Sequence, residues 1–330
     1  MVHDINLRWT SPVTPQRTSN GIVLALICLF LVAIMPIISN SRPSGSSALT
    51  FAVMFSVWQL IFSVPLFAWE AKKTRTGLFP PRFLLQQRKR TILIGIATGV
   101  MFGLSSIIYV VAAERAGAVN AAIAMQAYPL FAIFWETLFL RKSKSPVEIV
   151  LTLVLVGAMY FLATGGTLRM DGLSPWFLFA LGVPLLWSIA HVIIREELTR
   201  TPITPVQVTF FRSLISALFL VGLLLILNPK EFLSSLQFDF QIFALAMGLV
   251  YYIELIFWFH AVRHIDVSLA SSIITPWPAV TMMLAVLFLG DSLHTHQIVA
   301  FVLVAACIYG LLLVTVRRDR GRQPTTTCAP

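Results

Sequence analysis

Long apolar runs, separated by short polar segments, make up almost the whole chain. A helix needs about 20 apolar residues to cross a bilayer, and ten runs approach or exceed this length. They cover residues 21–39, 50–69, 91–113, 118–140, 146–164, 174–194, 204–227, 240–262, 266–289 and 294–316. Most gaps between them are short, so consecutive helices are expected to be antiparallel neighbours. The pattern predicts an all-α integral membrane protein with ten transmembrane helices.

Composition supports this class. The chain is 58% hydrophobic and 12% charged, whereas soluble domains carry about 25% charged residues. Its three cysteines, Cys28, Cys307 and Cys328, have no disulfide-framework or metal-ligand spacing. Segment 1–20 is polar, and the first apolar run is expected to be retained as a membrane span rather than cleaved as a signal. Segment 317–330 is expected to be a disordered cytoplasmic tail.

The distribution of Lys and Arg predicts the orientation. If the N-terminus is cytoplasmic, the inside segments hold 19 of these residues and the outside segments hold 4, while Arg212 falls within a span. Cytoplasmic loops carry an excess of Lys and Arg, so both termini are expected in the cytoplasm. The formal net charge of +10 then reflects topology and anionic lipid headgroups rather than nucleic-acid binding.

The sequence pattern of the run 118–140 is repeated in the run 266–289. Six positions align 149 residues apart, five with the same residue and one with a different aromatic residue: Ala121, Tyr128, Pro129, Phe139, Leu140 and Ser143 correspond to Ala270, Trp277, Pro278, Phe288, Leu289 and Ser292. Chance similarity between apolar helices is the alternative, but the register extends back to Tyr109 and Trp258. Five spans per half is an odd number, so the halves 21–164 and 174–316 are expected in opposite orientations. Inverted repeats place a binding site near the midplane between them.

Both copies share an alanine-rich entry, a mid-helix proline and an apolar exit at 138–140 and 287–291. With Leu186-Trp187-Ser188, Arg195 and Phe211-Arg212, these features resemble the two EamA-type repeats of the drug/metabolite transporter superfamily. The resemblance implies a 5+5 inverted-repeat carrier whose central cavity is lined by the first, third, fourth, sixth, eighth and ninth spans. It also implies peripheral fifth and tenth spans, often at a homodimer contact, and in many members the export of metabolites.

The ionisable groups of the pattern collect in the second half. When the two halves are aligned in sequence, Phe30 corresponds to Trp187, and Phe55 corresponds to Arg212. The two halves are therefore not expected to contribute equally to the substrate site.

Two opposite charges are expected at one depth in the membrane. Arg212 and Glu254 each lie about 12 Å from the cytoplasmic end of their spans, at 1.5 Å per residue. Charges within spans are costly and mark functional candidates. Two interpretations remain open: a structural ion pair between the two spans, or a carboxylate that faces the cavity and binds a cationic group or a coupling proton.

The aromatic–proline steps Tyr128-Pro129 and Trp277-Pro278 lie near mid-span. Proline frees a carbonyl one turn earlier, and Pro276 adds a second break. Such breaks suit gating or substrate binding, with packing kinks as the alternative. Gln126 and Thr275 lie beside the breaks and are candidate hydrogen-bond partners for a substrate.

Further candidates are aromatic. Tyr109, Trp187, Tyr252 and Trp258 offer apolar faces, polar hydrogens and cation–π contacts. As a set they predict a cavity for an amphipathic solute rather than a bare ion, although ordinary packing is the alternative for each. His191 is a candidate gate or proton relay, and an interfacial hydrogen bond is its alternative.

No phosphate-binding loop or hydrolase motif is found. The histidines at 260, 264, 294 and 296 lack a third internal ligand, so neither metal nor cofactor is expected. The leading hypothesis is a secondary carrier of the cell (inner) membrane that exports a small amphipathic metabolite, an amino acid or an amine. Multidrug or organic-cation efflux is the nearest alternative. An intramembrane enzyme or a channel is the alternative of another class, and would need a catalytic pair or a continuous polar stripe.

Overall fold

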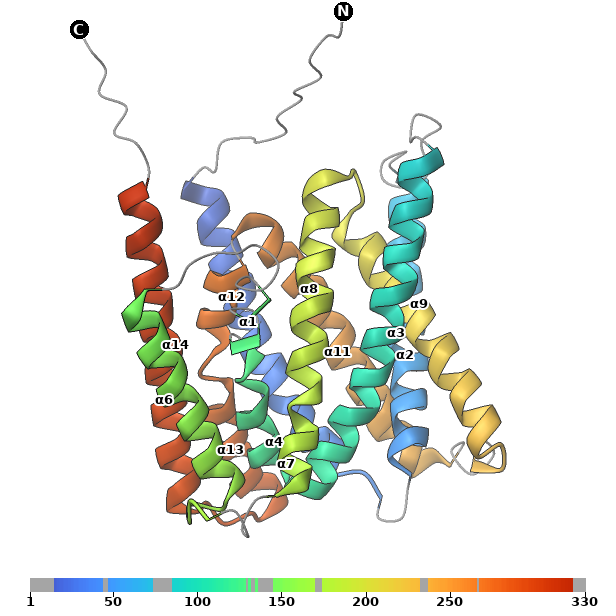
Figure 1. Cartoon of the computed structure of the whole chain (residues 1–330). Helices are drawn as coiled ribbons and strands as arrows, with labels where there is room; N and C mark the ends of the chain where they lie inside the picture. Colours follow the sequence, from blue (N-terminus) through green and yellow to red (C-terminus); the bar gives the residue numbers. More distant parts are fainter. Residues whose placement is uncertain are drawn as a thin grey trace, which may run out of the picture.

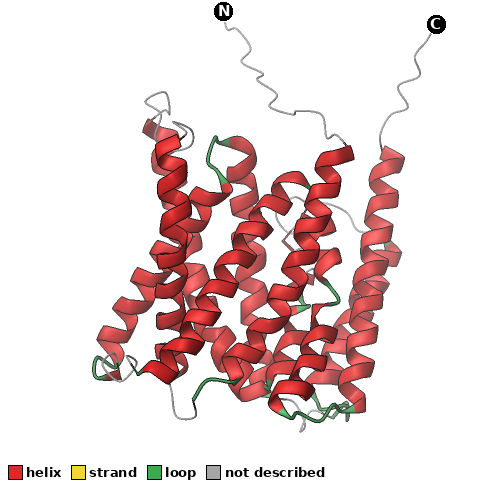
Figure 2. Cartoon of the chain, turned by 180° about the vertical axis from the view of Figure 1, so that it is seen from behind, coloured by secondary structure: helices red, strands yellow, loops and turns green. Residues whose placement is uncertain are grey.

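The computed structural model describes residues 15–43, 47–73, 85–128, 130–131, 134–135, 145–169, 174–231, 237–265 and 267–322. Within these ranges the chain is helical, without strands (Figure 2). The helices are α1 Pro15–Asn40, α2 Ala48–Lys73, α3 Leu85–Ala116, α4 Ala118–Met125, α6 Pro146–Ala163, α7 Pro175–Ala180, α8 Gly182–Arg200, α9 Pro205–Leu227, α11 Phe238–His264, α12 Val267–Ile274, α13 Trp277–Leu289 and α14 Thr295–Arg322.

Seven helical segments in the described residues are long and apolar enough to cross a membrane: Ser19–Asn40, Ala48–Lys73, Lys89–Ala116, Pro146–Ala163, Pro175–Leu198, Pro205–Leu227 and Phe238–His264. Shorter apolar segments cover Trp277–Leu289 and Thr295–Leu311. Many large apolar side chains lie on the outside, such as Leu153 on α6 and Leu287 on α13. Helices satisfy their own backbone groups, which is why such surfaces can face lipid. The chain is a multi-pass membrane protein.

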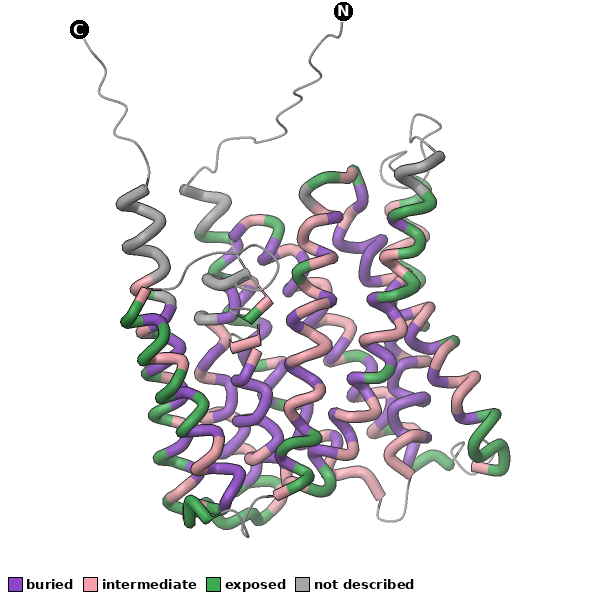
Figure 3. Tube along the Cα trace, viewed as in Figure 1, coloured by how far each residue is buried: buried purple, intermediate pink, exposed green. Residues whose placement is uncertain are grey.

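The helices pack side by side in one bundle (Figure 1). α11 packs along α1 and α2, α9 packs along α2 and α3, and α3 packs along α8. α6 and α14 pair with each other at one margin, where the exposed residues of α6 gather (Figures 1 and 3). α1 begins and α14 ends at the same end of the bundle (Figure 1).

Three expected spans are interrupted. α4 ends at Met125, and the backbone N–H of Gln126 donates to the Ile123 carbonyl. Thr275 and Pro276 separate α12 from α13, and Pro278 is the second residue of α13. This is the place where a proline costs no helical hydrogen bond. Leu181 separates α7 from α8, a break without a predicted counterpart. Pro129, the expected break of the first repeat, lies outside the described residues.

Glycines allow the closest helix approaches. A Cβ at Gly248 on α11 would lie 2.6 Å from the Trp58 Cβ and 2.7 Å from the Phe55 carbonyl oxygen, both on α2. A Cβ at Gly99 on α3 would lie 2.6 Å from the Ile215 Cβ on α9. The hydroxyl of Ser216 donates to the Gly99 carbonyl at 2.7 Å. Small residues are typical of helix interfaces in membranes because they let backbones approach closely.

Candidate functional site

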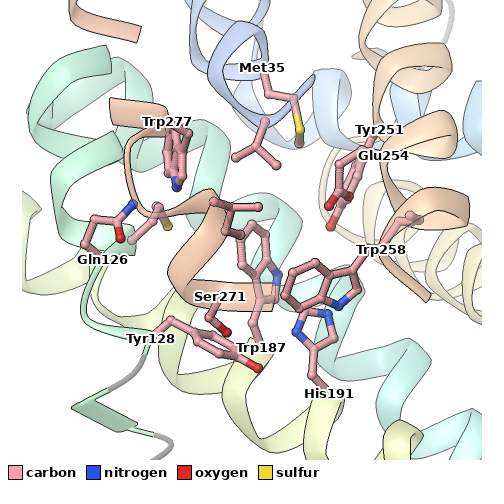
Figure 4. Close-up of a pocket in the computed structure, with 14 residues that line it drawn as sticks. Met35, Gln126, Tyr128, Trp187, His191, Tyr251, Glu254, Trp258, Ser271 and Trp277 are labelled. Carbon is pink, nitrogen blue, oxygen red and sulfur yellow. The ribbon is translucent and has the colours of Figure 1, made fainter. Parts of the chain in front are cut away.

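A central cavity of about 60 Å³ lies where α1, α4, α8, α11, α12 and α13 meet, with room for a few water molecules. Most of its wall is apolar. Figure 4 shows Gln126 and Trp277 on one side, Glu254 on the other, and Trp187 between them. The lining residues are Val32, Met35, Met125, Gln126, Tyr128, Trp187, His191, Tyr251, Glu254, Leu255, Trp258, Ser271, Ile274 and Trp277.

One face of α11 supplies the acid of the cavity. Tyr251, Glu254, Leu255 and Trp258 follow the i, i+3, i+4, i+7 spacing and therefore share a helix face. Glu254 is 7% exposed and is the one acidic residue among the described lining residues. Tyr252 is one position away from Tyr251, only partly buried, and absent from the lining. Tyr251, rather than the predicted Tyr252, therefore borders the cavity on this helix.

Aromatic rings surround His191 on α8. Its ring centroid lies 5.5 Å from that of Trp258, 5.8 Å from Tyr128 and 6.4 Å from Trp187. Neither ring nitrogen of His191 has a hydrogen-bond partner in the protein, and the same holds for Trp258 Nε1 and the Tyr128 hydroxyl. Buried polar groups are normally paired, so these atoms are available to a ligand or to water.

The residues beside the helix breaks do not all line the central cavity. Gln126 and Tyr128 line the cavity on one side, and Ser271, Ile274 and Trp277 line it around the α12–α13 break. Thr275 is fully buried outside the cavity lining. Its hydroxyl donates to the Ser271 carbonyl at 3.0 Å, a common use of threonine one turn along a membrane helix. Pro276 and Pro278 shape the start of α13 and do not line the cavity.

The comparisons with known proteins identify the family. The model of the EamA-like transporter family matches residues 19–164 and 174–313. The chain belongs to the EamA-like transporter family. The resemblance to the drug/metabolite transporter superfamily is thereby confirmed, and the protein is a membrane transporter.

The solved structures support the fold. The chain is similar to a protein of known crystal structure, with a TM-score of 0.59 and 17% sequence identity. The match covers 91% of this chain and 98% of the other. Likeness at this identity concerns the fold alone. No curated protein matches the chain.

Arg212 of this EamA transporter lies behind the cavity wall. Its Nη2 donates to the Tyr251 hydroxyl at 2.6 Å, and its guanidinium carbon lies 3.6 Å from the centroid of the Phe102 ring. No salt bridge within 4.0 Å joins Arg212 to Glu254. The direct ion pair between the two spans is therefore absent, and Tyr251 takes the place of the acid as the partner of Arg212.

Tyr109 supports the wall rather than lining the cavity. Its ring stacks on that of Trp187, with centroids 6.5 Å apart, and it is 4% exposed. Trp187 Nε1 donates to the Ser105 hydroxyl at 3.0 Å. Tyr109, Ser105 and Phe102 all belong to α3. This helix therefore packs against Trp187 and His191 on the side away from the cavity. The expectation that the third span lines the cavity is not met among the described lining residues.

Sequence reasoning missed several lining residues of the EamA transporter. Tyr251 carried a usable signal, because it lies one helical turn before Glu254. Ser271 likewise lies six residues before Trp277, in the helix that precedes the break. The apolar lining residues carried no signal, because every span is rich in such side chains. They are Val32, Met35, Met125, Leu255 and Ile274.

Proposed function

We propose that this EamA transporter is a secondary-active carrier of the inner membrane that works by alternating access. Its ten spans would form two five-helix repeats, 21–164 and 174–316, in opposite orientations. The two separate ranges matched by the family model support this division. The shared end at which α1 begins and α14 ends supports an even number of crossings. The excess of Lys and Arg in the inside segments supports cytoplasmic termini.

The proposed substrate is a small amphipathic amine. The observation that carries this proposal is the Glu254 carboxylate in a cavity walled by aromatic rings. A protonated amine would pair with the carboxylate and lie against Trp187, Trp258 or Tyr251, where cation–π attraction adds to apolar contact. An amino acid would also need a cation for its carboxylate. The described lining holds neither lysine nor arginine, so the amine is favoured of the two expected classes.

A larger organic cation is the second candidate. Met35 and Met125 border the same cavity, and methionine adapts to ligands of different shape. Under this alternative the carrier would accept several unrelated cations rather than one metabolite.

The helix breaks are the proposed moving parts. Tyr128-Pro129 and Trp277-Pro278 occupy equivalent positions of the two repeats, so each would act as a gate as one half rocks against the other. His191, which lies within the aromatic cluster, would act as a gate or proton relay. Export is the proposed direction, as the superfamily resemblance implies. The apolar outer side chains of α6 and α14 support a homodimer contact there.

The test is counterflow in proteoliposomes. Vesicles loaded with an unlabelled amine are diluted into a trace of the labelled amine, and transient accumulation is measured. A carrier accumulates label with saturable kinetics, whereas a channel equilibrates it and an enzyme changes it chemically. The proposal expects accumulation for amines and little for the neutral alcohols of the same shape. Equal transport of amine and alcohol would contradict the substrate class.

A further inference from the structure

A second cavity, distinct from the central one, lies between α3, α8 and α9. It measures about 320 Å³, a size typical of small-ligand pockets. Thr91 and Glu197 lie at the end of the bundle where α3 begins and α8 ends, and Arg212 lies further along α9. Its walls are formed mainly by Ile92, Ile94, Ile194, Ile203, Val208 and Phe211.

Arg212 borders this cavity and has hydrogen-bond donors without a partner. The residue is 3% exposed, and its Nε and Nη1 have no hydrogen-bond partner. Only Nη2 is engaged, by the Tyr251 hydroxyl. A guanidinium has five N–H donors and keeps its charge. A buried cation of this kind is costly in a membrane protein unless it meets an anion or water.

The other polar groups of the cavity do not neutralise Arg212. One Glu197 oxygen accepts from the Thr91 hydroxyl at 3.0 Å, and the other pairs with Arg90 at 3.6 Å. The Thr98 hydroxyl donates to the Ile94 carbonyl at 2.8 Å. The nearest acid on α11, Glu254, makes no salt bridge with Arg212. The cavity therefore combines long aliphatic walls with one cation that has no ion-pair partner within 4.0 Å.

We propose that this cavity binds an amphipathic monocarboxylate. The carboxylate would accept hydrogen bonds from Arg212 Nε and Nη1, a bidentate geometry that guanidinium favours. The aliphatic body would lie along the isoleucines of α3 and α8 and be removed from water there. This site is separate from the amine site of the central cavity, and its occupancy can be measured without any transport.

Octanoate is the probe. The full chain in nanodiscs of phosphatidylcholine is titrated with labelled octanoate, and octanamide serves as the neutral competitor of the same length. We expect saturable binding of one octanoate per chain and at least 10-fold weaker competition by octanamide. Arg212→Gln removes the anchoring cation and should reduce affinity by at least 10-fold.

Gly95→Leu places a larger side chain in the cavity and leaves Arg212 unchanged. A Cβ at Gly95 meets nothing within 4 Å, and Gly95 lines this cavity, so leucine can enter it while α3 keeps its place. This variant should lose octanoate binding. Gly222→Leu is the matched control on α9, where a Cβ also meets open space, and it should bind as the wild type does.

Three results would overturn the proposal: equal competition by octanamide, undiminished binding by Gly95→Leu, or displacement of octanoate by phosphatidylglycerol, which would make the site one for a lipid headgroup. Should Arg212→Gln fail to fold, the comparison of Gly95→Leu with Gly222→Leu decides alone. Loss of binding in Gly95→Leu but not in Gly222→Leu supports the proposal.

Discussion

Glu254→Gln is expected to lower amine transport by about 10- to 100-fold while the protein stays folded. The substitution keeps the size of the side chain and removes the negative charge. Hydrogen bonds to charged groups contribute about 1.5–3 kcal/mol, and each 1.36 kcal/mol is a factor of ten in rate. Initial rates of labelled amine uptake into proteoliposomes, normalised to reconstituted protein, measure the effect.

The control is the same substitution at a partly exposed acid outside the cavity. Glu196 on α8 pairs with Arg200 at the surface, and such pairs contribute little, so Glu196→Gln should transport as the wild type does. Elution of Glu254→Gln as a single peak with an unchanged melting temperature shows that it is folded. Wild-type rates in a folded Glu254→Gln protein would remove Glu254 from the substrate site.

Gly248→Leu is expected to cause the largest loss of stability. No side chain fits at this position, because a Cβ already lies 2.6 Å from the Trp58 Cβ and 2.7 Å from the Phe55 carbonyl oxygen. α11 would have to move away from α2, and overpacking of this kind costs about 1–3 kcal/mol or more. The melting temperature of the purified protein in one detergent measures it.

Gly222→Leu is the control for Gly248→Leu. It makes the same change in side-chain size and helix propensity at a position where no other helix is close, so it shows how much of the change in melting temperature comes from packing. The same residue change at this open position of α9 should leave the melting temperature nearly unchanged. Equal melting temperatures for the two variants would show that α2 and α11 do not meet as closely as the structure has them.

The helical fold could be predicted because a bilayer allows few solutions. Backbone groups in lipid must be paired within the helix, so apolar runs of sufficient length become helices. Their interruptions were harder to foresee. Pro276 predicts the break between α12 and α13, whereas the break at Leu181 between α7 and α8 is not among the predictions, although Gly182 and Pro184 follow it directly. Pro184 cannot donate a backbone hydrogen bond to the carbonyl four residues earlier, at Ala180 where α7 ends, so the local sequence does carry a signal for this break.

The site could be predicted in its chemistry and less well in its geometry. Residue type and depth indicate Trp187, His191, Glu254, Trp258 and Trp277 as site candidates, and the structure brings these residues to one cavity. Residue type alone does not show which way a side chain points on a helix that is apolar all round. The sequence therefore does not distinguish Tyr252 from the adjacent Tyr251, which lines the cavity with Glu254.

Two further residues show where depth alone falls short. The sequence predicts Arg212 at the same membrane depth as Glu254. In the structure the hydrogen-bond partner of Arg212 is the Tyr251 hydroxyl. The sequence predicts Thr275 as a hydrogen-bond partner for a substrate, but its hydroxyl donates to the Ser271 carbonyl. In both cases a hydrogen bond within the protein, between α9 and α11 for Arg212 and within one helical turn for Thr275, determines what remains available to a ligand.

The central claim is that the cavity around Glu254 opens alternately to the two sides of the membrane and holds the substrate. Ser271 lines this cavity, and cysteine replaces serine with little change in size. Ser271→Cys in a background lacking Cys28, Cys307 and Cys328 is treated with a membrane-impermeant trimethylammonium thiosulfonate, from each side of oriented vesicles. The account predicts labelling from both sides and protection by the transported amine. Labelling from one side only, or labelling that the amine does not slow, would contradict it.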